Sequence, residues 1–117
     1  MRLGVGLTPR WVTLNSAPDA RFRIRPMTAQ DRLELTMHIE KRGDLHYYPA
    51  EAQVQAIRAC LLEWDGVTDA DGQPVEYTPA HLQLIEDEVV LLELFGEVNH
   101  SARLQPSATP EDDEAGN

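Results

Sequence analysis

Residues 79–103 constrain the fold more than any other part of the chain. If they form a helix, apolar side chains cover most of its circumference. One face carries large apolar side chains at helical spacing, and a second set widens this surface beyond a single stripe. A helix of this kind is either central in its domain or buried against a partner, and a chain of 117 residues has few elements to surround it. We therefore expect some of these positions to pack internally and others to bind a partner. The candidate partner-binding residues are Leu84, Leu91, Leu94, Phe95 and Val98.

Helix start and stop signals divide the chain into three helices, over about 29–42, 50–64 and 79–103. Thr28 with Asp31 three residues on forms a capping box, and Gly43 is a plausible stop. Thr78 followed by Pro79 is a second start signal. In the middle helix one stripe is predicted to be buried: Val54, Ile57, Leu61 and Trp64.

The region before the first helix predicts a β-hairpin over about 10–26. Phe22 and Ile24 alternate with arginines at period two, so one face of this strand should be inward. An isolated hairpin is marginally stable in water, so it must pack on the helices. The predicted fold is mainly α, with a short N-terminal β-hairpin packed on a compact bundle of three to four helices. Residues 1–105 should form a single globular domain, followed by a disordered acidic tail at 106–117.

The charge of the chain is distributed unevenly along its length. The net charge is −10, but residues 1–42 carry eight basic and four acidic side chains, whereas residues 43–117 carry two basic and sixteen acidic ones. Acidic proteins are repelled by nucleic acid, so this balance favours a dipolar molecule that orients on a protein partner. The first seven residues lack the apolar length of a signal peptide, and no segment has the roughly 20 apolar residues of a membrane span. We expect a protein that stays where it is made and binds neither nucleic acid nor membranes.

Residue patterns that support catalysis are not found in the sequence. The four histidines do not have the spacing of a zinc-binding motif, and Cys60 lies beside an apolar stripe, where a thiol is normally inert. The loop from Asp65 to Glu76 has several acidic residues, but Val67 and Ala70 occupy positions where a calcium-binding loop needs a ligand and a glycine. The expectation is a protein that is not an enzyme and needs no metal or cofactor.

Four stretches, in their order along the chain, resemble those of bacteriophage tail assembly chaperones. The family is similar in having an extended opening that ends in Arg-Pro-x-Thr, a segment closing on tryptophan, an Asp-Gly loop and a Thr-Pro helix start. The matching residues here are Trp11-Val12-Thr13-Leu14, Arg21-Phe22-Arg23-Ile24-Arg25-Pro26-Met27-Thr28, Leu61-Leu62-Glu63-Trp64-Asp65-Gly66-Val67 and Asp69-Ala70-Asp71-Gly72-Gln73-Pro74-Val75-Glu76-Tyr77-Thr78-Pro79. The resemblance spans residues 11–104.

The resemblance implies a non-enzymatic function in the cytoplasm of a host bacterium. Such a chaperone binds the long tape-measure protein and keeps it soluble until tail tube subunits polymerise around it, and it can self-associate. Two other hypotheses remain open, a structural head–tail connector or minor virion protein and an acidic inhibitor of a host protein that mimics nucleic acid. A connector would copurify with mature virions, whereas an assembly chaperone would not.

Overall fold

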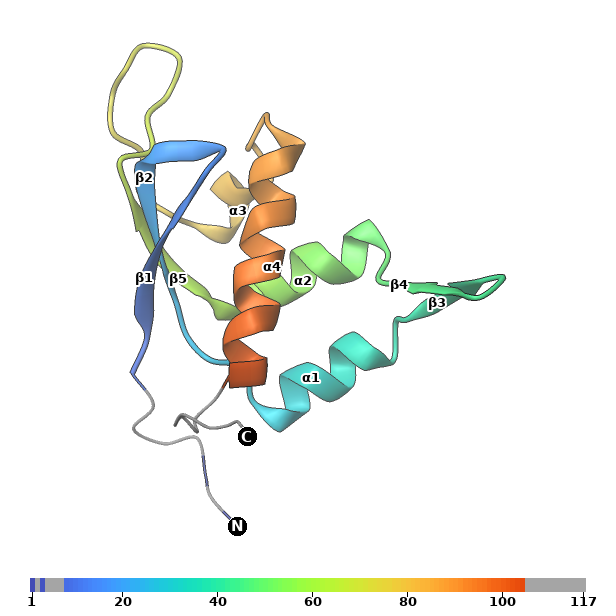
Figure 1. The fold of residues 1–117 in the computed structure, drawn as a ribbon. Helices are drawn as coiled ribbons and strands as arrows, with labels where there is room; N and C mark the ends of the chain where they lie inside the picture. The colour runs from blue at the N-terminus through green and yellow to red at the C-terminus, as the bar shows by residue number, and fades with distance from the viewer. Residues whose placement is uncertain (2, 4–7, 105–117) are drawn as a thin grey trace.

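A three-stranded antiparallel sheet and the helices on one of its faces organise the part of the chain that the structure describes (Figure 1). The structure is a computed structural model that describes residues 1, 3 and 8–104, with side chains as far as His100. The sheet has the order β1-β2-β5, built from β1 (Arg10–Leu14), β2 (Ala17–Ile24) and β5 (Leu61–Asp65). The predicted N-terminal hairpin is confirmed, since β1 pairs with β2 and Val12 lies opposite Phe22.

The prediction of a mainly α fold is wrong, because the fold is mixed α/β, with 38% helix and 27% strand. Residues that were expected to end the middle helix form β5 instead. Helix α2 (Ala50–Cys60) stops at Cys60, and the next residue, Leu61, already has the extended angles φ −77° and ψ 123°. Strand β5 then pairs with the free edge of β2, which supplies the support that an isolated hairpin lacks.

A β-bulge explains why the sequence of β5 resembles a helix. Leu61 pairs with Ile24 and Glu63 pairs with Arg23, so Leu62 is an extra residue between them. The bulge lets Leu61 and Trp64 face the same side although they are three residues apart. The stripe expected on one helix is therefore divided between two elements. Its members Ile57, Leu61 and Trp64 are buried, and Val54 is half-buried.

The first helix is also shorter than predicted. Helix α1 (Ala29–Thr36) begins with the expected capping box, in which Thr28 and Asp31 bond each other's backbone N–H groups. It ends at Thr36 rather than at residue 42. A small hairpin follows, formed by β3 (Glu40–Arg42) and β4 (Leu45–Tyr47), and Gly43 lies in its turn with a φ of +62° instead of ending a helix.

The predicted helix over 79–103 is two helices. Thr78 caps α3 as expected, but α3 (Pro79–Leu82) has only four residues before the chain turns. Helix α4 (Glu88–Leu104) starts anew, and the Asp87 carboxylate accepts a hydrogen bond of 2.9 Å from the backbone N–H of Val89. That bond satisfies one of the free N–H groups at the start of a helix.

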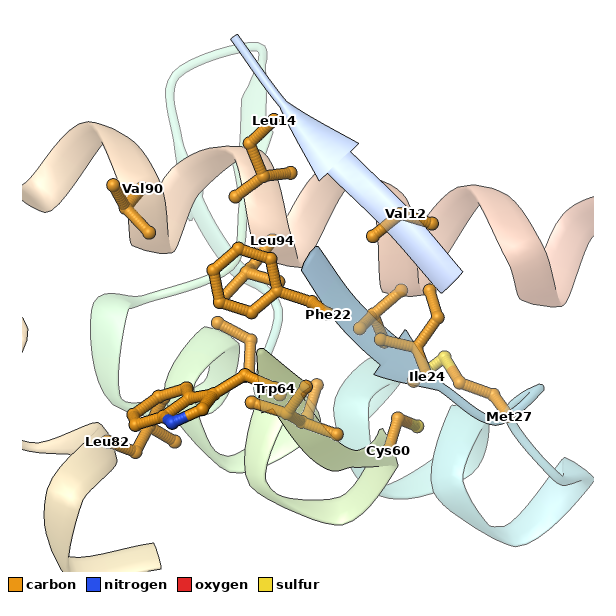
Figure 2. Close-up of a cluster of buried hydrophobic side chains, with 14 of the residues drawn as sticks. Val12, Leu14, Phe22, Ile24, Met27, Cys60, Trp64, Leu82, Val90 and Leu94 are labelled. Atoms are coloured by element: carbon orange, nitrogen blue, oxygen red, sulfur yellow. The ribbon is translucent and has the colours of Figure 1, made fainter. Parts of the chain in front are cut away.

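The core lies between the sheet and helices α2 and α4 (Figure 2). Val90, Leu94 and Val98 recur every four residues on α4 and form one buried row. Phe22 and Ile24 of the central strand are 2% and 1% exposed, as their alternation with arginines predicts. The outer face of the sheet is polar and carries cross-strand ion pairs, Arg21 with Asp65 at 3.3 Å and Arg23 with Glu63 at 2.8 Å.

Helix α1 and the β3–β4 hairpin extend away from the sheet (Figure 1). Two polar contacts hold the N-terminal half of α1. Arg32 donates to the side-chain oxygen of Asn99 on α4 at 3.2 Å, and Arg25 bonds Asp31 at 2.8 Å. Burial acts to raise the pKa of Asp31, but hydrogen bonds from Arg25 and Thr28 outweigh it and lower the pKa.

Two sequence-based expectations concern larger parts of the chain. No helix within residues 8–104 is long and apolar enough to cross a membrane. The predicted acidic tail at 106–117 lies outside the described residues.

Candidate partner-binding groove

The side chains considered for catalysis do not assemble into a reactive site within the described residues. Cys60 is fully buried, and burial raises the pKa of its thiol to about 11, so the thiol stays protonated and unreactive at neutral pH. His81 faces a backbone oxygen, with its Nδ1 atom 2.7 Å from the carbonyl of Glu76. Residues 8–100 contain no group of three His, Cys, Asp or Glu side chains placed to hold a metal ion.

The five predicted partner-binding residues fall into three environments. Leu94 and Val98 were predicted to contact a partner, but both are 0% exposed in the core. In this conformation their side chains have no surface that a partner could contact. Leu91 and Phe95 are half-buried, and the Phe95 ring meets Tyr48 edge-on at 5.6 Å. Leu84 is 71% exposed. Leu84 is thus the one of the five that a partner can reach freely.

Leu84 lies at a groove with a volume of about 680 Å³, which three separate segments of the chain enclose. One is the β1–β2 turn with the start of β2, the second is the loop after β5, and the third joins α3 to α4. Figure 1 shows these segments together at one end of the molecule. We call it the end groove. Its described apolar lining is Ala17, Pro18, Ala20, Phe22, Trp64, Val67, Ala70, Val75, Leu84, Ile85 and Val90.

The end groove has a buried floor and more exposed walls. Phe22, Trp64 and Val90 are at most 8% exposed and belong to the core (Figure 2), so the floor is part of the packed interior. Val67, Val75 and Ile85 are half-buried, and Leu84 projects furthest into solvent. A concave surface of this size with an apolar floor fits the side chains of a peptide or helix.

Close packing at Gly66 fixes the loop after β5 against the hairpin. Gly66 has a φ of +83°, and a Cβ atom built on it would lie 2.2 Å from the backbone oxygen of Asp19. Further along, Asp69 accepts hydrogen bonds from the N–H groups of Asp71 and Gln73, both at 2.9 Å. The indole N–H of Trp64 donates to the carbonyl of Val75 at 2.7 Å and closes the loop.

The rim of the end groove is acidic. Asp19, Asp69, Glu86 and Asp87 all line it and are exposed, and His81 is the only residue of a basic type in its described lining. Asp69 and Asp87 accept backbone hydrogen bonds, which leaves their negative charge in place. Next to the groove, the hydroxyl and backbone N–H of Ser16 both donate to Glu93 and lower the pKa of that carboxyl.

A second, smaller hollow of about 210 Å³ lies between α1 and α2. Its lining mixes charges of both signs, with Asp31 and Glu34 on α1 and Arg58 on α2. Asp31 is already paired with Arg25. The end groove is therefore the larger and more uniformly charged candidate for a partner.

Sequence reasoning located Leu84 but missed the groove around it. Residues 79–103 carry more apolar side chains than one buried helix face needs, and this excess indicated that Leu84 is exposed to a partner. The floor residues looked like ordinary core positions, and nothing in the sequence indicated that three segments lying between Ser16 and Val90 meet there. Comparisons of the chain with protein-family models, curated proteins and solved structures find no match.

We expect the substitution Tyr77→Phe to leave stability unchanged or to increase it by up to about 1 kcal/mol. The Tyr77 ring packs edge-on against Trp64 at 5.0 Å, while its hydroxyl is buried with no hydrogen-bond partner among the described residues. Burial likewise raises the pKa of this phenol. Urea unfolding of the two proteins measures the difference. A loss of more than about 1 kcal/mol would mean that the hydroxyl has a partner.

Proposed function

We propose that the protein is a non-enzymatic tail assembly chaperone of a long-tailed bacteriophage. It acts in the cytoplasm of the host bacterium, binds the tape-measure protein and keeps it soluble during tail assembly. The resemblance of residues 11–104 to this family motivates the proposal. The observation that carries it furthest in the structure is the end groove, a concave apolar surface with Leu84 exposed beside it.

The physical requirement of such a chaperone is apolar surface that a client can cover. A long amphipathic client aggregates through its own apolar face, and a groove that shelters part of that face lowers its tendency to do so. The net charge of −10 supports the solubility of a protein that presents such a surface.

The test is co-expression with the tape-measure protein of a phage or prophage that carries this gene, with the soluble fraction of the client as the readout. The Leu84→Glu variant should weaken client binding about tenfold, since a charge then enters the apolar contact, and less client should stay soluble. Leu84 is 71% exposed, so the variant should fold normally.

Leu45→Glu is the matched control. Leu45 is 63% exposed on the β3–β4 hairpin, which lies away from the end groove (Figure 1). If Leu45→Glu weakens binding and Leu84→Glu does not, the client binds elsewhere on the molecule. If the wild-type protein neither binds the client nor keeps it soluble, the chaperone proposal fails. Recovery of the protein from mature virions would then favour a structural connector.

A further inference from the structure

The end groove combines two properties that together define what can occupy it. Its floor is apolar, formed by Phe22, Trp64 and Val90, and its rim is acidic. An apolar floor alone would accept any apolar side chain. The acidic rim adds a charge requirement, because groups next to the bound apolar side chains lie beside carboxylates.

The charge of this rim is not neutralised by neighbouring cations. Some exposed carboxylates elsewhere are paired, as Glu63 is with Arg23 and Asp65 with Arg21 on the outer face of the sheet. In contrast, Asp19, Asp69, Glu86 and Asp87 form no ion pair with any residue in the described part of the chain. The molecule therefore has a local negative potential at the mouth of an apolar groove.

From this charge complementarity we propose that the end groove binds an amphipathic segment of a partner protein whose apolar side chains are flanked by lysine or arginine. The apolar side chains occupy the floor, and the flanking cations lie against Asp19 and Glu86, which two different segments of the chain contribute to the rim. This inference rests on the proposed function, in that the segment belongs to the client. It adds that the chaperone selects cationic segments of the client over acidic ones.

The selection follows from like-charge repulsion as much as from attraction. Exposed ion pairs contribute only modestly to binding affinity. Repulsion between an acidic segment and the acidic rim weakens the binding of that segment further. Several such contacts together should produce about a tenfold preference for the cationic segment. Because the rim is exposed to solvent, salt should screen the preference.

Two synthetic amphipathic peptides test the proposal. Both carry leucines at positions i, i+3, i+4 and i+7, and they differ only in having lysines or glutamates beside these leucines. Calorimetric titration of the full chain should give about tenfold tighter binding of the lysine peptide at low salt, and the difference should shrink several-fold at about 0.5 M salt. Equal affinities, or no binding of either peptide, would overturn the proposal.

Two variants with the same change in net charge test whether the preference for the lysine peptide arises at the end groove. The double substitution Asp19→Asn and Glu86→Gln should remove most of the preference for lysine. The double substitution Asp44→Asn and Glu51→Gln changes exposed acids outside the groove and should preserve it. If the two variants behave alike, the preference comes from overall charge, and the assignment to the rim is wrong.

Fluorescence locates the bound peptide independently. The chain has two tryptophans, and Trp11 lies on the outer face of the sheet with the Arg21 guanidinium 4.4 Å from its ring centre. In the Trp11→Phe variant the emission comes from Trp64 on the groove floor, and it should shift when the lysine peptide binds. An unchanged spectrum at saturating peptide would place the peptide elsewhere and overturn the proposal.

The peptide experiment and the co-expression experiment test different proposals, so either proposal can be rejected while the other stands. Soluble client without a charge preference would leave the chaperone proposal standing and reject selection by the rim. A clear charge preference without any effect on client solubility would support the groove's specificity and reject the tape-measure protein as its partner.

Discussion

Replacing Leu94 with alanine should lower the free energy of unfolding by about 2–5 kcal/mol. Leu94 is 0% exposed and lies in the middle of the buried row on α4, between Val90 and Val98, facing the sheet (Figure 2). The substitution removes buried methyl groups and leaves a cavity that the sheet and α4 can close only in part. Urea unfolding followed by circular dichroism measures the loss.

Leu92→Ala is the control on the same helix. Leu92 is 55% exposed, so its truncation should change stability by less than about 0.5 kcal/mol. A loss below about 1 kcal/mol for Leu94→Ala would mean that this face of α4 is not buried against the sheet. Leu94 would then return as a candidate contact for a partner.

Gly66→Ala should be the most damaging substitution of a surface residue, with a loss of at least about 3 kcal/mol. Two effects add at this position. The φ of +83° is unfavourable for any residue with a side chain, and the new Cβ would lie 2.2 Å from the backbone oxygen of Asp19. Because that oxygen belongs to strand β2, neither side can yield without moving the loop away from the hairpin.

Gly72→Ala separates these two effects. Gly72 has nearly the same backbone angle, with a φ of +80°, but no atom lies within 4 Å of where its Cβ would be. It should lose only about 1 kcal/mol, the cost of the backbone conformation alone. Thermal melts of both variants provide the comparison. Equal losses at the two glycines would contradict the close approach of the loop to Asp19.

The local signals of the sequence predicted several elements correctly. The alternation around Phe22 indicated a strand, and Thr28 and Thr78 marked helix starts that the structure confirms. These features depend on neighbouring residues alone. They can therefore be recognised without knowing what the rest of the chain does.

The errors arose where a distant segment decides the local structure. Leu61 and Trp64 continue a helical spacing from Ile57, but pairing with β2 and a bulge at Leu62 make them part of a strand. The break after Leu82 had a signal that was overlooked, since Asp87 directly before Glu88 is a typical N-cap. The end groove could not be predicted, because its shape depends on how three segments pack together.

The late position of β5 in the sequence matters during synthesis on the ribosome. Arg23 and its partner Glu63 are 40 residues apart, so the β1–β2 hairpin emerges well before the strand that completes the sheet. At about 5–20 residues per second, β2 waits roughly 2–8 s with an unpaired edge. Such an edge can pair with another nascent chain, and charged side chains oppose that pairing. The arginines of β2, at positions 21 and 23, thus protect the growing chain before they have ion-pair partners in the folded one.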